Sequence, residues 1–437
     1  MERKKRIGIC TLGCRVNQYE SEAIEKKLSE YDFDICDFSE KNDVYIINTC
    51  TVTAESDRKS RQMIRRALKT SPDAKVLVCG CYSQMFKDDV AKITGVDYIS
   101  GTANKMDIVS AVLRLADDPI KRQPEICVSE LDGIGFENME AVCQGRTRAF
   151  LKIEDGCNNK CAYCIIPKAR GRVRSKPIES VIAEVKMLVS NGYKEIVLVG
   201  IETAAYGFGD GFGLIDLLEQ LEGIDGLERI RLGSMDPSYL KDKIIDRLAK
   251  LKKAMPHYHL SLQSGTDSVL NAMRRRYNTE MVRRTVSYMR EKIPNVTFGA
   301  DLIVGFPGET DEAFNSVLDF AKEMQILNSH IFSYSIRPGT EAAEMKCQIP
   351  TETKEKRFSL LKGISDISKK NIIEEYISDQ KTFEVLFEQE KDGYYTGHTD
   401  NFVCVKVKNK TNICGQIRKV VLKKYNEKDG MTEGELV

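Results

Sequence analysis

Three cysteines fall within eight residues of this chain, in the segment GCNNKCAYCIIPKARGRVRSKP at residues 156–177. Cys157, Cys161 and Cys164 form a C-x3-C-x2-C pattern. Neither a helix nor a strand points all three side chains the same way. We therefore expect a loop that gathers three thiolates, the ligands that favour zinc, copper(I) or iron–sulfur clusters. A cube of four irons held by three cysteines would leave one iron without a protein ligand.

Two other interpretations of this triplet are less consistent with the spacing. A structural zinc site usually needs four ligands from paired C-x2-C units, and only one such pair occurs in the chain. Ferredoxin-type electron transfer would want a fourth cysteine further on, and none follows until Cys347.

The triplet, with Tyr163 before its last cysteine, resembles the radical S-adenosylmethionine superfamily. The resemblance implies that the open iron binds the amine and carboxylate of S-adenosylmethionine. An electron passed into the sulfonium then releases a 5′-deoxyadenosyl radical. Cys157, Cys161 and Cys164 are thus expected to be both metal ligands and catalytic residues.

Composition bounds the class of protein. A length of 437 residues predicts two or three domains. The net charge of +1 excludes a globally basic nucleic-acid binder, so an anionic polymer has to be held by local patches. Fourteen cysteines without a secretory signal favour thiols and metal ligands over disulfides. No apolar stretch approaches the length of a membrane span, so we expect a soluble, cytoplasmic protein.

Residues 1–118 alternate between strand and helix patterns, which predicts a parallel sheet with crossover helices. The strand candidates are RIGICTL, DVYIINTC and KVLVCGC. Helices are expected over residues 18–30 and 58–69 and after Gln84. Ligands of such sheets gather beyond the carboxyl ends of the strands.

Three cysteines occupy that edge: Cys14, Cys50 and Cys81. Spacing alone makes this a plausible soft-metal site. We choose Cys81 over Cys79 because Cys81 lies past Gly80, where the chain can turn towards the edge. Cys10, Cys36 and Cys79 are interpreted as packed free thiols.

The segments TLGCRVN, INTCTVT and CGCYSQ resemble the three cysteine motifs of the methylthiotransferase family, in the family's order and upstream of a radical triplet. The resemblance implies that Cys14, Cys50 and Cys81 hold a second [4Fe–4S] cluster, again with one open iron. Residues 119–145 mix Pro, Gly and acids and are expected to form a linker, in which Cys127 and Cys143 are incidental.

Residues 146–372 are expected to form a partial (β/α)6 barrel and a trailing helix, because six βα units fall short of the usual eightfold barrel. The strand candidates are AFLKIED, EIVLVG, RIRLGS, YHLSLQ, TFGADLIVG and SHIFSYS. One helix is expected to begin after the cap residue Thr310. The radical triplet follows the first strand, on the face where barrel chemistry resides.

The superfamily resemblance places S-adenosylmethionine against the strand ends of this barrel. The expected cofactor-binding residues are Tyr163, Gly200, Glu202, Ser234, Asp236 and Gln263. Glu202 could accept hydrogen bonds from the methionyl amine, and Ser234 and Asp236 suit ribose hydroxyls. Each of these polar groups could equally satisfy local backbone.

Basic residues repeat at every second position from Lys168 to Lys176, which would put five cations on one side of an extended segment. From this run Lys168, Arg170, Arg172 and Arg174 are candidate RNA contacts. Further basic runs lie at residues 58–69 and 274–276. A solvated charged face is the alternative for each patch.

Residues 373–437 are expected to form a further domain, which begins within the last turns of a helix that runs from a cap near Thr353 to Ser378. The segments TFEVLFE, YYTGHTD, FVCVKVK and GQIRKVVLKKY predict a small antiparallel barrel. Between Lys381 and Lys424 nine Lys or Arg face five acids, a balance of +4. The segment resembles the TRAM domain of RNA-modifying enzymes, which implies RNA contacts by Lys406, Lys408, Arg418 and Lys419. A docking module for a protein partner is the alternative.

The resemblance covers essentially the whole α/β chain and implies a methylthiotransferase acting on a tRNA anticodon stem-loop. CIIPKARG and TLGCRVN look most like the enzymes that add a methylthio group to carbon 2 of threonylcarbamoyl-adenosine next to the anticodon. One S-adenosylmethionine would donate a methyl group to sulfur and another would be cleaved. A flavodoxin- or ferredoxin-type electron donor and a sulfur source are implied as partners.

Several alternatives stay open at this point. The isopentenyl-adenosine branch of the family is the nearest, and the branch that modifies an aspartate of a ribosomal protein is another. A protein of a different class, a non-catalytic iron–sulfur RNA-binding protein, would share the same cysteines.

Overall fold

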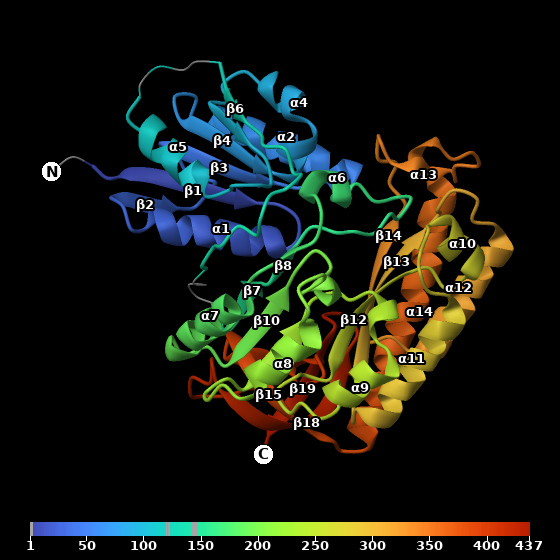
Figure 1. Cartoon of the computed structure of the whole chain (residues 1–437). Helices are drawn as coiled ribbons and strands as arrows, with labels where there is room; N and C mark the ends of the chain where they lie inside the picture. The colour runs from blue at the N-terminus through green and yellow to red at the C-terminus, as the bar shows by residue number, and fades with distance from the viewer. Residues whose placement is uncertain (1–2, 119, 121–122, 142–146) are drawn as a thin grey trace.

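The computed structural model describes residues 3–118, 120, 123–141 and 147–437. Three units follow one another along the chain: an N-terminal α/β sheet, a central open barrel and a small C-terminal β-barrel (Figure 1). The α/β fold class expected from the sequence is confirmed. Cys143 lies outside the described residues.

The N-terminal sheet has six parallel strands in the order β2-β1-β3-β4-β5-β6. Their bounds are β1 Lys5–Thr11, β2 Phe33–Cys36, β3 Val44–Thr49, β4 Lys75–Gly80, β5 Tyr98–Ser100 and β6 Glu125–Cys127. The helices are α1 Arg15–Leu28, α2 Ala54–Thr70, α3 Cys81–Met85, α4 Lys87–Ala91 and α5 Asp107–Leu115. Strand β6 lies in the segment expected to be a linker, and it extends this sheet by one strand.

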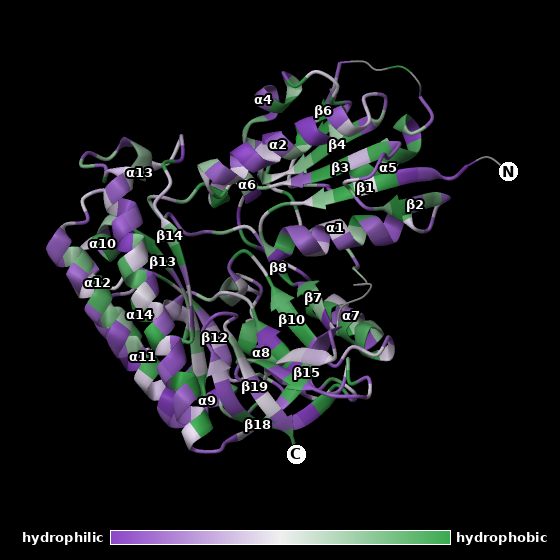
Figure 2. Ribbon diagram, turned by 180° about the vertical axis from the view of Figure 1, so that it is seen from behind, coloured by the Kyte–Doolittle hydropathy of each residue, from purple (hydrophilic) through white to green (hydrophobic). Residues whose placement is uncertain are grey.

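The two central strands explain why this sheet is covered on both faces. Every residue of β3 and β4 is buried, as expected for a parallel strand packed between helices. Helices α1 and α5 pack on one face and α2 on the other. Figure 2 shows hydrophobic residues concentrated in β3 and β4, whereas α2 is largely hydrophilic.

The central barrel has six parallel strands in two hydrogen-bonded groups, β7-β10-β11 and β12-β13-β14. A bridge between Met235 and Leu260 joins the groups, and no pairing closes β7 onto β14 among the described residues. The strands are β7 Arg148–Lys152, β10 Glu195–Val199, β11 Arg229–Leu232, β12 His257–Gln263, β13 Thr297–Val304 and β14 Asn328–Ser333. The partial (β/α)6 barrel is confirmed.

Helices alternate with these strands. They are α7 Ile178–Ser190, α8 Leu214–Glu222, α9 Asp242–Leu248, α10 Asp267–Ala272, α11 Thr279–Lys292, α12 Asp311–Met324 and α13 Glu341–Glu344. The expected cap of α12 is present, because the Thr310 hydroxyl accepts a hydrogen bond from the Ala313 N–H at 3.1 Å.

A 28-residue helix, α14 (Thr351–Ser378), leads to the C-terminal barrel. Thr353 lies inside this helix and Pro350 precedes it, so the expected cap at Thr353 is wrong. Five strands close the barrel in the order β15-β16-β17-β19-β18. They are β15 Thr382–Lys391, β16 Tyr394–Thr399, β17 Cys404–Lys408, β18 Ile417–Asn426 and β19 Met431–Leu436.

Strand β19 was not predicted, and it changes the charge of the C-terminal barrel. With β19 and the turn before it, residues 381–437 hold ten Lys or Arg and nine acids, a balance of +1. Lys406 contacts Asp429 and Glu433, at 2.8 and 3.5 Å, and Lys423 contacts Glu435 at 3.0 Å. The expected surplus of +4 is therefore largely neutralised.

The two outer units contact opposite ends of the central barrel. At the carboxyl ends of its strands, Lys152 contacts Glu20 of α1 at 2.7 Å. At the amino ends, the guanidinium of Arg229 donates to the Glu384 carbonyl at 2.8 Å, and that of Arg231 to the Thr399 carbonyl at 2.7 Å. No helix within the described ranges is long and apolar enough to span a bilayer.

Candidate active site

The radical triplet, Cys157, Cys161 and Cys164, lies on the loop between β8 (Glu154–Asp155) and α6 (Ile166–Arg170). The Cys157 N–H donates to the Gly171 carbonyl at 3.0 Å, which folds the loop back on itself. Gly156 has φ +86°, and a Cβ there would lie 2.0 Å from the Arg172 carbonyl oxygen. Only glycine fits this close approach, so the residue before the triplet sets its path.

The three cysteines of this triplet are partly buried, and one of them meets a buried cation. Burial raises the pKa of the Cys157 thiol to about 12 and that of the Cys164 thiol to about 11. The Arg275 guanidinium donates to the Cys161 sulfur at 3.1 Å and to the Asp236 carboxylate at 2.8 Å. Three sulfur donors beside a cation suit a thiolate-ligated cluster. The sequence placed Arg275 in a surface patch, and nothing local distinguishes it from Arg274 and Arg276.

A cavity of about 370 Å³ opens beside the radical triplet, lined by Cys157, Glu202 and Asp236 among others. Burial and the nearby Asp236 carboxylate raise the pKa of Glu202 to about 7. Glu202 accepts a hydrogen bond from the Asp236 N–H at 3.0 Å. Asp236 caps a short turn through the Ser238 N–H at 2.9 Å and pairs with Arg275, so local bonds occupy much of its carboxylate.

The other expected cofactor contacts are dispersed around the strand ends. Gly200 and Ser234 line a second, larger cavity. Gln263 ends β12 with φ +61° and is 9% exposed. Tyr163 packs among apolar side chains that include Phe306 and Tyr334. The structure therefore brings only Glu202 and Asp236 of the expected set to the cavity beside Cys157.

Glu154 is a buried acid that sequence reasoning did not single out. It is fully buried and accepts a hydrogen bond from the Glu202 N–H at 2.8 Å. Burial raises its pKa well above the ordinary value. Its Oε1 atom has no hydrogen-bond partner among the described residues.

The auxiliary triplet, Cys14, Cys50 and Cys81, gathers at the carboxyl edge of the N-terminal sheet. Cys14 directly precedes α1, Cys50 follows β3 and Cys81 begins α3. Gly13 has φ +99°, and a Cβ there would lie 2.8 Å from the Cys50 sulfur. Burial, with lesser contributions from Cys81 and Cys14, raises the pKa of the Cys50 thiol to about 11. The three thiols are thus close enough to interact.

Cys79 faces away from this group. It is fully buried among the apolar side chains of the α1 and α5 face, including Ile7 and Ile24. Burial raises the pKa of its thiol to about 12. The geometry favours Cys81 over Cys79 as a partner of Cys14 and Cys50.

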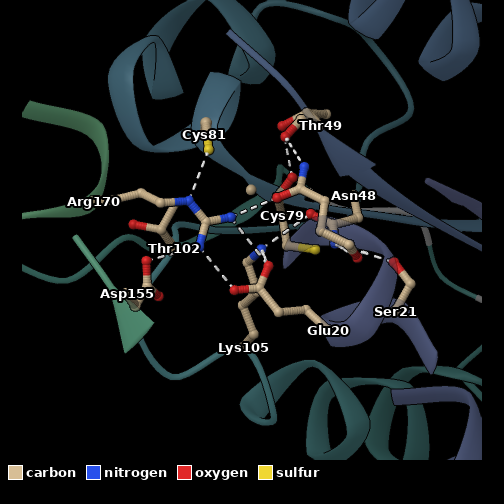
Figure 3. A network of polar contacts seen from close by, with 12 residues as sticks. Glu20, Ser21, Asn48, Thr49, Cys79, Cys81, Thr102, Lys105, Asp155 and Arg170 are labelled. Atoms are coloured by element: carbon tan, nitrogen blue, oxygen red, sulfur yellow. Dashed lines mark hydrogen bonds and ion pairs between the residues drawn. The ribbon is translucent and has the colours of Figure 1, made fainter. Parts of the chain in front are cut away.

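The run from Lys168 to Lys176 is not an extended row of cations. Residues 166–170 form α6, and Arg170 and Lys176 are almost completely buried. Lys176 pairs with Glu184, and Lys168 donates to the Gly339 carbonyl at 2.6 Å. The expected RNA contact by Arg170 is wrong, because its guanidinium is engaged inside the protein (Figure 3).

The remaining candidate RNA contacts differ in solvent exposure and in ion pairing. Arg172 is exposed, whereas Arg174 lies 3.4 Å from Asp155 and is mostly covered. In the C-terminal barrel Lys408, Arg418 and Lys419 are exposed. Lys406 is held by its acidic neighbours on the β19 side.

The larger cavity, about 750 Å³, reaches from the auxiliary triplet along the open side of the barrel. Cys14, Gly200 and Ser234 line one end of it, and His398 of the C-terminal barrel lines the other. Helix α14 contributes the side chains of Lys362 and Lys369.

A histidine–aspartate–histidine cluster lies in the wall of this larger cavity. Asp301 lies 3.0 Å from His259 Nε2 and 3.2 Å from His330 Nδ1. Burial would raise the pKa of Asp301, but the two imidazoles outweigh it and hold the pKa at about 2. The cluster thus offers a charged carboxylate and two imidazoles to whatever fills the cavity. Sequence spacing does not reveal this cluster, because His259, Asp301 and His330 come from three separate strands, β12, β13 and β14.

Comparisons with known proteins agree with this architecture. The model of the radical SAM superfamily matches residues 151–321, and that of the uncharacterized protein family UPF0004 matches residues 6–101. A solved structure of the radical S-adenosylmethionine methyltransferase TsrM from Kitasatospora setae shares the fold, with a TM-score of 0.56 and 16% identity. It covers 78% of this chain and 77% of that one.

Curated relatives match over nearly the whole chain. The threonylcarbamoyladenosine tRNA methylthiotransferase of Bacillus subtilis is 38% identical, covering 96% of this chain and 95% of the relative. That of Aquifex aeolicus is 36% identical, over 84% and 90%. A tRNA-2-methylthio-N(6)-dimethylallyladenosine synthase of Acetivibrio thermocellus is 32% identical, over 95% and 88%.

The fold and the first triplet define a radical S-adenosylmethionine enzyme. Within that class, the chain belongs to the methylthiotransferase family. S-adenosylmethionine and [4Fe–4S] clusters are the cofactors of this family, and the donor sets fit them. Each triplet supplies three soft sulfur ligands next to an arginine, Arg275 in one case and Arg170 in the other.

Proposed function

We propose that this enzyme adds a methylthio group to carbon 2 of threonylcarbamoyl-adenosine in the anticodon loop of tRNA. The observation that carries the proposal is the larger cavity, which is lined by Cys14 of the auxiliary triplet and by Gly200 and Ser234 at strand ends of the central barrel. A reaction that combines sulfur transfer with radical activation needs both partners to reach one substrate atom. Relatives of this description match over 96% of the chain.

The two triplets have different roles in the proposal. Cys157, Cys161 and Cys164 would hold the cluster that cleaves S-adenosylmethionine, and Cys14, Cys50 and Cys81 the cluster that supplies the methylated sulfur. The clusters would provide electron transfer and sulfur delivery, chemistry that protein side chains lack. A radical is needed because the hydrogen on carbon 2 of adenine is not acidic enough for a general base.

The residues around the radical triplet would bind and orient the methionyl end of the cofactor. Glu202, with a pKa near 7, offers a carboxylate to the ammonium group when it is ionised. Glu154 accepts a hydrogen bond from the Glu202 N–H at 2.8 Å, which fixes the strand end. Arg275 holds both Asp236 and the Cys161 sulfur, which keeps the cavity and the triplet in register.

The wall of the larger cavity favours a polar substituent on the adenosine. His259 and His330 line this wall and pair with Asp301, and the partly buried Lys369 donates only to the Gly430 carbonyl among the contacts described for it. The ureido, hydroxyl and carboxylate groups of threonylcarbamoyl-adenosine can pair with such a wall. An isopentenyl group cannot, because it has no hydrogen-bonding atom to offer these polar side chains.

The reaction also requires an RNA substrate, an electron donor and a source of sulfur. The substrate is the anticodon stem-loop, whose single-stranded bases can be splayed for recognition. A low-potential electron donor of the flavodoxin or ferredoxin type and a sulfur source complete the reaction, and tRNA places it in the cytoplasm.

Mass spectrometry of tRNA nucleosides tests the proposal. In cells lacking the protein, 2-methylthio-threonylcarbamoyl-adenosine should disappear while threonylcarbamoyl-adenosine accumulates, and the intact gene should restore it. Loss of the methylthio form of isopentenyl-adenosine alone would assign the enzyme to the other branch. If neither modification changed, the proposal that tRNA is the substrate would be refuted.

The purified enzyme provides a second test. After anaerobic reconstitution, reductant and S-adenosylmethionine should yield 5′-deoxyadenosine. Its absence would favour a non-catalytic iron–sulfur RNA-binding protein.

A further inference from the structure

Arg170 lies in the segment that follows the radical triplet, and its guanidinium contacts the auxiliary triplet. Arg170 ends α6, six residues after Cys164, and its side chain is completely buried. Its Nε–H donates to the Cys81 sulfur at 3.3 Å. Figure 3 shows this bond, with the rest of the guanidinium directed at the acids on its other side.

The same guanidinium is tied to the other two cysteines through one side chain. An Nη2–H of Arg170 donates to the Asn17 Oδ1 atom. The Asn17 amide in turn donates to the Leu12 carbonyl at 2.7 Å and to the Thr49 carbonyl at 3.0 Å. Leu12 lies two residues before Cys14, and Thr49 directly precedes Cys50. One arginine therefore connects all three segments that carry the auxiliary triplet.

Buried charges around Arg170 leave a positive excess next to Cys81. The carboxylates are Glu20, 2.9 Å from the Arg170 Nη1 atom, and Asp155, 3.0 Å from it. Lys105 and Lys152 contact Glu20 as well. Three buried cations thus face two buried carboxylates. At the rim, Arg174 and Glu137 add one charge of each sign.

An uncompensated buried cation is costly, and a cysteine thiolate bound to iron would compensate it. Arginine suits this place better than lysine, because its planar group directs several N–H bonds at fixed angles. Here these bonds reach a sulfur, an amide oxygen and two carboxylates.

We propose that Arg170 is a positioning residue of the auxiliary site, which fixes the three cysteines and tunes the reduction potential of the cluster they hold. Hydrogen bonds to cluster sulfurs and nearby positive charge favour the reduced cluster. The inference rests on the proposed function, because it takes Cys81 as a cluster ligand. Arg170 also connects the auxiliary site to the loop of the radical triplet, because it follows Cys164 by six residues.

The test uses full-length protein in which Cys157, Cys161 and Cys164 are all alanine, so that only the auxiliary cluster forms. After anaerobic reconstitution, its potential is measured by EPR-monitored redox titration and its stability by iron release to a chelator. In Arg170→Gln the potential should become more negative, and iron release should be about tenfold faster or more. Arg170→Lys should lie between Arg170→Gln and the parent.

A matched control is Arg247→Gln. Arg247 also pairs with two acids, Asp216 and Glu219, but it does so at the surface. This variant should keep the potential and the iron release of the parent. Unchanged values in a folded Arg170→Gln protein would overturn the inference.

Two further variants keep the test decisive. If Arg170→Gln does not fold, Asn17→Ala removes the link to Leu12 and Thr49 while leaving Arg170, and it should also release iron faster; an unchanged rate overturns the inference. Cys81→Ala tests the ligand itself. Iron retention equal to the parent would refute the assignment of Cys81 in the proposed function. Iron loss in Cys81→Ala with parental values in Arg170→Gln would refute the role of Arg170 alone.

Discussion

Two cysteine triplets of the same size are assembled in opposite ways. Cys157, Cys161 and Cys164 lie within eight residues of one loop, whose path is set by Gly156 and by a bond to the Gly171 carbonyl. Cys14, Cys50 and Cys81 come from the ends of three parallel strands, and tertiary structure alone brings them together.

The difference lies in what each triplet depends on. The local triplet needs little more than its own loop and the nearby Arg275. The dispersed triplet needs the register of the N-terminal sheet and two arginines from the central barrel. Arg170 donates to Cys81, and Arg337 donates to Thr51, the residue after Cys50. Mutations at the contact between the two units should therefore affect the auxiliary triplet first.

Removing one ligand from each triplet gives the largest expected effect. Cys161→Ala should abolish formation of 5′-deoxyadenosine and remove about four of about eight irons per chain. Cys14→Ala should remove a similar amount of iron, abolish methylthio transfer and leave cleavage of S-adenosylmethionine intact. Both are measured by chromatography of the products and by iron analysis. Loss of cleavage in a folded Cys14→Ala protein would mean that the triplets share a single cluster.

Substitution of Arg337 tests whether the N-terminal unit, which carries the dispersed triplet, depends on the central barrel. Its guanidinium donates to Asp57 and to the Thr51 hydroxyl, both at 2.7 Å, and is almost fully buried. Arg337→Ala leaves Asp57 without this partner and should destabilise the protein by roughly 3–5 kcal/mol.

The effect of Arg337→Ala is measured as the midpoint of denaturation by urea. The surface pair of Arg284 and Asp242 supplies the control, because Arg284→Ala should cost about 1 kcal/mol or less. Equal effects of the two variants would contradict the comparison.

Substitution of Glu202, which lies beside the radical triplet, should change the pH dependence of protein stability. Its pKa rises from the ordinary 4.5 to about 7 in the fold, so the folded state disfavours the charged form. The stability that Glu202 contributes is complete at low pH and is lost as the pH rises towards 7, by about 3 kcal/mol.

Glu202→Gln should therefore be more stable than the parent at pH 8 and no more stable at pH 4. Thermal denaturation at the two pH values measures this. Binding of S-adenosylmethionine should strengthen between pH 6 and 8 in the parent only. A parallel pH profile in Glu202→Gln would show that another group titrates.

The smallest expected effects come from single surface cations of the C-terminal barrel. Lys408→Gln and Lys419→Gln should each reduce the slope of log affinity against log salt by about 1. Lys406→Gln should change it less, because Lys406 is already paired with Asp429 at 2.8 Å. Binding of an anticodon stem-loop at several salt concentrations measures the slopes. Equal changes for Lys406 and Lys408 would contradict this ranking.

The sequence predicted most of what depends on local spacing or on a simple topological rule. The radical triplet follows from its spacing, and the strand-end rule brought Cys14, Cys50 and Cys81 to one edge. Arg170 could not be placed in this way. Its alternation with Lys168 and Arg172 indicated an extended cationic row, but Pro167 lies in the first turn of a short helix and the partner Glu20 lies 150 residues away.

Strand β19 was missed for a different reason. MTEGEL carries a glycine and two acids, and it pairs with β17 and β18 only when the barrel closes around it. Closure of a barrel can stabilise a segment whose own strand propensity is weak. The positive charge of the C-terminal barrel was overestimated because the acids of this strand were not counted.

Helix α14 fixes a length within the molecule. Near its start, Arg357 pairs with Glu309 beyond the end of β13, and near its end Ile373 and Tyr376 pack into the C-terminal barrel. Its 28 residues span about 42 Å. Lys362 and Lys369 of the same helix line the larger cavity, between Cys14 at one end and His398 of the C-terminal barrel at the other. A continuous helix of this length therefore fixes where the C-terminal strands stand relative to that cavity.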